Sequence, residues 1–202
     1  METATALPPL WLQLSYTAFV AVLVPVYWRK YGPGNFLWFS DIALFAVGIA
    51  LWTGSKLLLS MMAVAVLLPE LAWNLDYFYQ LITGRTLLGL SSYMFDRRKS
   101  LFLRGLSLFH VVLPVLILWL LSQWGYQRQA LYWQTALAWL VLPLTYYLTN
   151  PEENINWVFG PGEKAQHKVP RQLYLLAVML FFPVAVYLPS HLLLLWLFGE
   201  TP

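Results

Sequence analysis

Long runs of apolar residues, separated by short polar breaks, dominate the sequence. Each run is apolar on every side and roughly 18–25 residues long, the length that a helix needs to cross the hydrocarbon core of a bilayer. A segment in lipid must satisfy its own backbone hydrogen bonds, and a helix does so. We expect six spans, at roughly residues 10–28, 36–52, 56–80, 101–121, 130–148 and 173–198.

Helix-breaking residues mark the boundaries between these spans. They lie at residues 31–35 after the first span, at 53–55 after the second, and at Gly125 between the fourth and fifth. The last run is longer than a bilayer needs, so we expect Pro189-Ser190 to break it, with Ser190 capping a short interfacial helix. No internal repeat divides the chain. Residues 1–202 are therefore predicted to form one all-α domain, a polytopic membrane helical bundle.

The composition agrees with this pattern. Hydrophobic residues make up 60% of the chain and charged residues 10%, whereas a soluble domain carries about 25% charged residues. The net charge of +3 is confined to loops and fits membrane lipid headgroups as partners better than nucleic acid. The first residues lack a basic stretch and a cleavage site, so no signal peptide is expected. The absence of cysteine excludes a Cys-ligated metal site.

The distribution of basic residues predicts the orientation. Lys56 and Arg128 are the basic residues on one side of the predicted bundle, and ten lie on the other: Arg29, Lys30, Arg85, Arg97, Arg98, Lys99, Arg104, Lys164, Lys168 and Arg171. Basic loops stay in the cytoplasm. We therefore expect both termini outside, in a bacterial inner (plasma) membrane.

Four ionisable residues fall inside the predicted spans: Asp41, Glu70, Asp76 and His110. Such groups cost several kcal/mol in lipid, so we expect them to face the bundle interior. Glu70 and His110 share a depth of ~15 Å from the cytoplasmic side at 1.5 Å rise per residue, and Asn74 lies on the same helix face as Glu70. We expect a polar cavity open to the cytoplasm, with residues 150–160 folded over it as a lid or partly re-entrant loop.

Each of these residues also has a purely structural explanation. Asp41 and Asp76 lie close enough to the interface to be solvated or paired with basic residues. Glu70 follows Pro69 and can bond a carbonyl that the proline frees. A lone histidine such as His110 often makes only an interhelical hydrogen bond. No metal, cofactor or phosphate-binding motif is predicted, because no H-x-x-x-H pair or glycine-rich loop occurs.

Three segments resemble the androgen-induced proteins, a family of six-span enzymes that hydrolyse fatty-acid esters of hydroxy fatty acids. Residues 31–42 read Tyr-Gly-Pro-Gly-Asn-Phe-Leu-Trp-Phe-Ser-Asp-Ile, residues 109–114 read Phe-His-Val-Val-Leu-Pro, and residues 156–161 read Asn-Trp-Val-Phe-Gly-Pro. The resemblance implies a six-span fold with His110 at the position of the family's catalytic histidine. The family's threonine nucleophile falls on Trp38, which cannot attack an ester, and its termini are expected in the cytosol. The resemblance therefore implies a shared fold more than a shared reaction.

Three functions remain open from the sequence. The first is an intramembrane enzyme for lipid-ester hydrolysis or acyl transfer, with Ser40 as nucleophile, His110 as general base and Asp41 or Glu70 orienting the histidine. Its substrate-binding residues are predicted to be Asn74, Asp76, Asn154, Asn156 and Trp157, and either Asn154 or Asn156 could donate to an oxyanion. The second is a non-catalytic membrane subunit or lipid-binding scaffold. The third is a proton-coupled carrier with Glu70, Asp76 and His110 as a relay.

Overall fold

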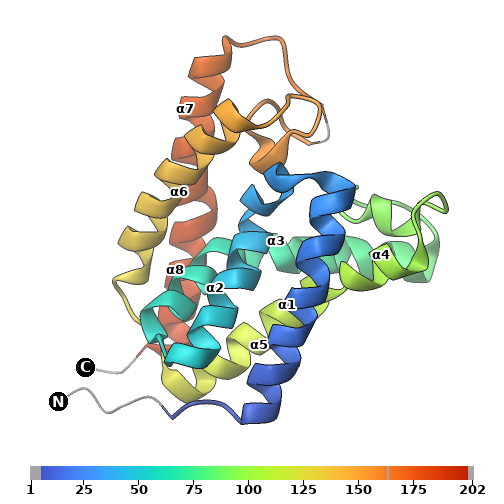
Figure 1. Ribbon diagram of the computed structural model, residues 1–202. Helices are drawn as coiled ribbons and strands as arrows, with labels where there is room; N and C mark the ends of the chain where they lie inside the picture. Colours follow the sequence, from blue (N-terminus) through green and yellow to red (C-terminus); the bar gives the residue numbers. More distant parts are fainter. Residues whose placement is uncertain (1–5, 163, 200–202) are drawn as a thin grey trace.

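The regular secondary structure is helical throughout the part of the chain that the computed structural model describes, residues 6–162 and 164–199. The α-helices form six rods (Figure 1). These are α1 (Leu10–Tyr31), α2 (Phe39–Thr53), α3 (Lys56–Thr83), α4 (Leu101–Leu106) with α5 (Phe109–Trp124), α6 (Ala130–Leu148), and α7 (Arg171–Phe181) with the π-helix η4 (Phe182–Tyr187) and α8 (Leu188–Phe198). Three short 3-10 helices lie between rods: η1 (Pro33–Leu37), η2 (Ser92–Phe95) and η3 (Ile155–Trp157). The prediction of an all-α fold is confirmed.

Successive connections between the rods lie at opposite ends of the bundle. At one end, the Trp124 indole donates to the carbonyl of Ala6 at 3.1 Å, and the Tyr126 amide donates to the carbonyl of Phe198 at 3.3 Å. At the other end, the Asn156 side chain donates to the carbonyl of Leu37 at 2.7 Å, which joins two loops. We call this second end the basic end, because it carries the loops with most lysines and arginines. The first and last described residues thus lie at the same end, as an even number of rods requires.

Helix α3 is central to the packing. It contacts α2, α5, α6 and α8, and its residues 62–67 are all buried in the apolar core. The outward faces of the rods are apolar as well, with Trp196, Leu180 and Val115 among the most exposed side chains. Four rods are long and apolar enough to cross a membrane: Leu10–Tyr31, Lys56–Thr83, Leu101–Trp124 and Arg171–Phe198. Helix α2 is apolar but shorter.

Two predicted spans contain irregularities that the sequence pattern missed. The fourth span is interrupted at Ser107 and Leu108, so α4 and α5 are separate helices. The last span does not break at Pro189-Ser190, and that prediction is wrong. The helix instead widens into the π-helix η4, where the Leu188 amide bonds the carbonyl of Pro183 five residues back. This wider turn accommodates prolines that lack an amide donor, and the Ser190 hydroxyl donates to the carbonyl of Val186 rather than capping a helix.

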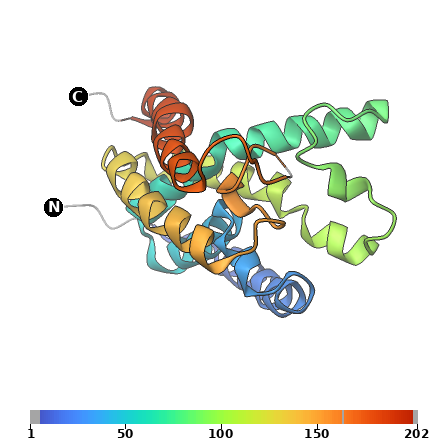
Figure 2. The ribbon, with the colours of Figure 1, turned by 90° about the horizontal axis from the view of Figure 1, so that it is seen from above.

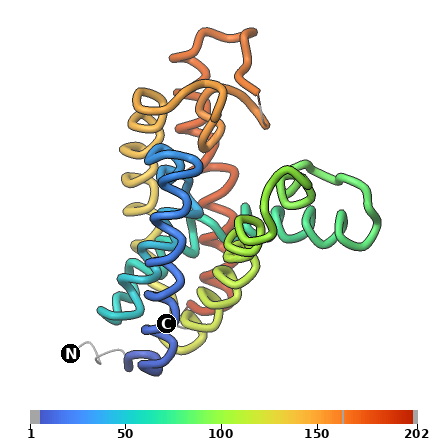
Figure 3. The backbone as a smooth tube through the Cα atoms, turned by 45° about the vertical axis from the view of Figure 1, so that its right-hand side comes forward, coloured from blue at the N-terminus to red at the C-terminus, as the bar shows by residue number. Residues whose placement is uncertain are grey.

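Residues 71–106 form an arm that projects sideways from the bundle. The arm consists of the second half of α3, the following loop with η2, and α4, and the views from the front and from above both show it beyond the other rods (Figures 1 and 2). The tube view shows the same projection from a third direction (Figure 3). Helix α3 is capped by Gly84, whose left-handed conformation (φ 70°) turns the chain into the loop.

Candidate functional site

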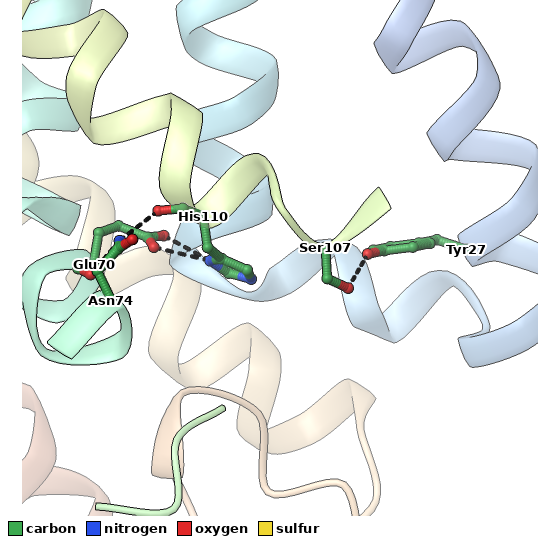
Figure 4. Close-up of polar contacts among 5 residues, drawn as sticks. All are labelled: Tyr27, Glu70, Asn74, Ser107 and His110. Carbon is green, nitrogen blue, oxygen red and sulfur yellow. Dashed lines mark hydrogen bonds and ion pairs between the residues drawn. The ribbon is translucent and has the colours of Figure 1, made fainter. Parts of the chain in front are cut away.

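A buried carboxylate and a histidine meet between α3 and α5. Both carboxylate oxygens of Glu70 lie within hydrogen-bond distance of His110 Nδ1, at 3.0 and 2.9 Å (Figure 4). Glu70 is 3% exposed, and the His110 side chain is 15% exposed. The shared depth predicted for these two residues is confirmed by this contact, and we call the pair the dyad.

Aromatic rings hold the imidazole in place. The Trp73 ring stacks on His110 at 4.7 Å between centroids, and the Phe109 ring stacks on it at 4.1 Å. The Glu70 carboxylate occupies Nδ1, while Nε2 makes no hydrogen bond to any described residue. A histidine held in this way by a carboxylate presents Nε2 as its free basic nitrogen when it is neutral.

Asn74 ties together the two helices that carry the dyad. Its Nδ2 donates to the backbone carbonyl of Glu70 at 2.8 Å and to that of His110 at 2.7 Å (Figure 4). The second of these carbonyls lies on α5, so the amide spans the helix interface. Asn74 therefore fixes the position of the dyad through the backbone and does not contact the imidazole itself.

Asp41 is a second buried carboxylate near the dyad. It lies in the first turn of α2, is 3% exposed, and accepts a hydrogen bond from Asn35 Nδ2 at 3.3 Å. Its other oxygen, Oδ1, has no hydrogen-bond partner among the described atoms. The expectation that Asp41, Glu70, Asn74 and His110 lie inside the bundle is confirmed, because the three ionisable side chains are largely buried and Asn74 is half-buried with two partners.

A pair of hydroxyl groups lies beside the dyad, and the sequence analysis did not identify it. The Tyr27 hydroxyl and Ser107 Oγ are 2.8 Å apart (Figure 4). Ser107 sits at the interruption between α4 and α5, one turn before His110, and the close-up shows it on the side of the imidazole away from Glu70. Tyr93 of η2 also lies at this cluster: burial raises the pKa of its phenol, and the neighbouring Tyr27 and Glu70 raise that pKa further.

Ser40 and His110 do not form the predicted nucleophile–base pair. The Ser40 hydroxyl makes no hydrogen bond to any residue within the described ranges. The bond of His110 runs from Nδ1 to Glu70, one of the two carboxylates predicted to orient the histidine. Ser40 lies in the first turn of α2 and is half-buried. The difference in depth along the two helices accounts for the separation.

Asp76 organises the arm rather than the dyad. Its Oδ1 accepts hydrogen bonds from the amides of Leu87, Leu88 and Gly89, and its Oδ2 accepts from the amide and hydroxyl of Ser91. The side chain is fully buried under this loop. Five donors satisfy both oxygens, so Asp76 holds the loop in place and has no lone pair directed at a ligand.

Asn154 and Asn156 shape the loop that follows α6. Asn154 Nδ2 donates to the carbonyls of Gly160 and Gly162, and its Oδ1 accepts from the Phe159 amide. Asn156 Oδ1 accepts from the Phe39 amide at the start of α2. Both residues and the half-buried Trp157 have positive φ. This loop folds back onto the bundle at the start of α2, and its role as the lid of a polar cavity stays a prediction. Its two amides bond backbone groups and are not directed at an oxyanion.

One hollow of the molecule lies apart from the dyad. A hollow of about 380 Å³ lies between α6 and η4, on an apolar outer face lined by residues such as Trp139 and Val184. Within residues 6–162 and 164–199, no group of three or more His, Asp or Glu residues could hold a metal ion.

Comparison of the chain with protein-family models, with curated proteins and with solved structures finds no match. The resemblance of three short segments to the androgen-induced proteins thus stays an expectation from sequence. The functional argument depends on the geometry of the site alone.

Proposed function

We propose that this chain is an integral membrane protein that crosses the bilayer six times, with its basic end in the cytoplasm and both termini outside. Three features support the proposal: four rods of spanning length, apolar outward faces, and connections that alternate between two ends. Apolar side chains exposed in such number would be costly in water and favourable in lipid. The excess of lysine and arginine at one end favours the cytoplasm for that end.

We further propose that the Glu70–His110 dyad acts as a general base in hydrolysis or transfer of a lipid acyl ester. The observation that carries this proposal is that the Glu70 carboxylate occupies Nδ1 at 2.9 Å while Nε2 has no partner among the described residues. In this arrangement Nε2 takes the proton of a water or an acceptor hydroxyl as its oxygen attacks the ester carbonyl, and Glu70 stabilises the resulting imidazolium. The same proton then passes from Nε2 to the departing alkoxide as the ester C–O bond breaks.

The hydroxyl pair extends this mechanism. Tyr27 and Ser107 lie beside the imidazole, on the side away from Glu70 (Figure 4). A hydroxyl donor at this place can bind the carbonyl oxygen on which negative charge develops. Ser40 is not needed, since water or an acceptor hydroxyl supplies the nucleophile.

The experiment measures hydrolysis of fluorogenic acyl esters of short and long chain by the purified protein in detergent. We expect Glu70→Gln and His110→Asn to lower turnover by about 100-fold or more, the usual contribution of a general base. Ser40→Ala is the matched control and should retain turnover. An inactive wild type across all esters, or full activity in His110→Asn, would exclude the catalytic proposal.

A non-catalytic membrane subunit or scaffold is the second candidate. The observation that favours it is the Asn74 side chain, which lies on α3 and donates to the carbonyl of His110 on α5 as well as to that of Glu70 on its own helix. In a scaffold, the Glu70–His110 contact would serve the same purpose of fastening two helices. The variants above would then lower thermal stability without any ester turnover to lose.

A proton-coupled carrier is less well supported. That function needs Asp76 as an exchangeable member of a relay with Glu70 and His110. Asp76 instead accepts five hydrogen bonds from the loop of residues 87–91. A carboxylate so fully engaged is a structural anchor.

A further inference from the structure

The outer part of the arm has a larger net positive charge than the whole chain. Residues 81–104 contain five basic residues and one acidic residue, a net charge of +4, whereas the whole chain has +3. The rest of the chain is therefore slightly negative. Within the arm, the acid Asp96 is bound by Arg98 at 2.9 Å, so Arg85, Arg97 and Lys99 have no carboxylate partner in the described structure.

The same arm exposes large apolar side chains. Ile82 is 81% exposed and Leu101 is 77% exposed, and Leu81, Leu88 and Phe102 are each more than half exposed. All residues from 81 to 88 are exposed. Basic and apolar side chains side by side on a projecting segment are typical of an element that lies in a membrane interface.

The position of the arm agrees with that role. The Lys99 ammonium lies 5.3 Å from the ring centroid of Tyr31, the last residue of α1, and 5.0 Å from that of Tyr93. The base of the arm is thus level with the end of α1 that carries Arg29 and Lys30. From there the arm runs sideways, across the direction of α1 (Figures 1 and 2).

We propose that this arm lies along the cytoplasmic leaflet and binds anionic phospholipid headgroups. Arg85 and Arg97 are exposed and available to phosphate, and the exposed Arg98 adds positive charge beside them while it is paired with Asp96. Ile82, Leu101 and Phe102 enter the acyl region beneath. A second copy of this chain is a poorer occupant, because the outer parts of two arms, residues 81–104 with a charge of +4 each, repel one another. The proposal depends on the membrane crossing described above and not on catalysis by the dyad.

The test uses spin-labelled lipids with the full chain reconstituted in phosphatidylcholine bilayers. The fraction of motionally restricted lipid is compared for spin-labelled phosphatidylglycerol and spin-labelled phosphatidylcholine. We expect the wild type to prefer phosphatidylglycerol by about twofold or more at low salt, and the preference to fall as salt screens the charges. In the variant Arg85→Gln/Arg97→Gln/Arg98→Gln the ratio should fall close to one.

The matched control is Lys164→Gln/Lys168→Gln/Arg171→Gln. It removes the same three charges from the same end of the molecule, from exposed positions outside the arm, and should keep the preference. Equal loss in both triple variants, or an unchanged preference in the arm variant, would overturn the proposal.

A second measurement places the arm in depth. The chain contains no cysteine, so Ile82→Cys and Glu152→Cys each supply one site for a spin label. We expect the label at position 82 to be more accessible to oxygen, which concentrates in lipid, and that at 152 to be more accessible to a water-soluble nickel complex. Equal access of the nickel complex to both labels, or efficient disulfide cross-linking between two copies of the Ile82→Cys variant, would contradict the lipid-bound arm.

Discussion

Glu70 illustrates how a single buried charge constrains its neighbours. A carboxylate at this depth is retained only with a partner, and here the imidazole of His110 and the Asn74 amide lie on the same interface. The contact of Glu70 with His110 could be predicted from the depths of the two residues along their helices. The contact of Tyr27 with Ser107 could not be predicted in this way, because the interruption of the helix at Ser107 changes the depth and direction of the serine side chain.

Asn74 is expected to matter for both stability and turnover. Asn74→Ala removes the bonds to the carbonyls of Glu70 and His110, and we expect a loss of about 1–2 kcal/mol in the free energy of unfolding. Thermal unfolding in detergent measures it, with Ser40→Ala as a control whose hydroxyl makes no hydrogen bond in the described structure. An Asn74→Ala variant as stable as the control would contradict this role.

Asp76 gives a prediction that is local to the arm. Asp76→Ala leaves the amides of Leu87, Leu88, Gly89 and Ser91 without their acceptor, and we expect a loss of about 2–4 kcal/mol. Hydrogen exchange should show these amides losing protection while the core of α3 keeps it. Unchanged protection of Leu88 and Ser91 would rule out the anchoring role.

Asp96 provides a prediction about pH. The hydrogen bonds from Arg98 lower the pKa of the Asp96 carboxyl from 3.8 to about 2. Because the folded-state pKa is the lower one, the contact stabilises the arm at pH values above 3.8 and its contribution disappears as the pH falls through about 2. A titration of the carboxyl carbon by NMR should find the midpoint near the lower value, and Arg98→Gln should return it toward the ordinary one.

At the scale of elements, the helices were predictable and their irregularities were not. Runs of apolar residues define where α1, α3 and α6 lie, since any helix in lipid must have such a surface. The position of the π-helix depends on how α6 and α3 pack against it. The π-helix contains Pro183 and ends two residues before Pro189, and both prolines lack the amide donor of a regular helix.

The loop after α6 is expected to depend on Gly160. A Cβ at this position would collide with the backbone of Lys164 and Gln166, so Gly160→Ala should cost about 2 kcal/mol or more. Gly105→Ala is the control, since nothing lies near its Cβ position in α4 and the change should stabilise the helix by about 0.5–1 kcal/mol. Equal melting temperatures for the two variants would contradict the close approach.

The conformation of this loop could not be predicted from the sequence, because it depends on backbone torsions. The sequence predicts that Asn154 or Asn156 donates to an oxyanion, whereas both residues have positive φ and bond backbone groups. Whether an asparagine side chain meets a ligand or its own loop depends on backbone torsions, which residue type does not determine.

For the whole molecule, the connections alternate between two ends of the bundle, and the end that faces the cytoplasm is predicted from the basic residues alone. Thr53→Cys and Glu152→Cys are substitutions at exposed sites at opposite ends of the bundle. A membrane-impermeant maleimide added to intact cells should label position 53 and not position 152. The reverse labelling pattern would place the basic end outside and contradict the proposed binding of the arm to the cytoplasmic leaflet.

The protonation of His110 tests the proposed base most directly. Nitrogen-15 NMR of the reconstituted protein, at a pH where the imidazole is neutral, distinguishes the two ring nitrogens. The structure predicts that Nδ1 carries the proton toward Glu70 and that Nε2 is unprotonated, and that Glu70→Gln changes this distribution. A proton on Nε2 with Nδ1 bare, unaltered by Glu70→Gln, would mean that the basic nitrogen of His110 is the one facing Glu70, and that Nε2 is not the proposed general base.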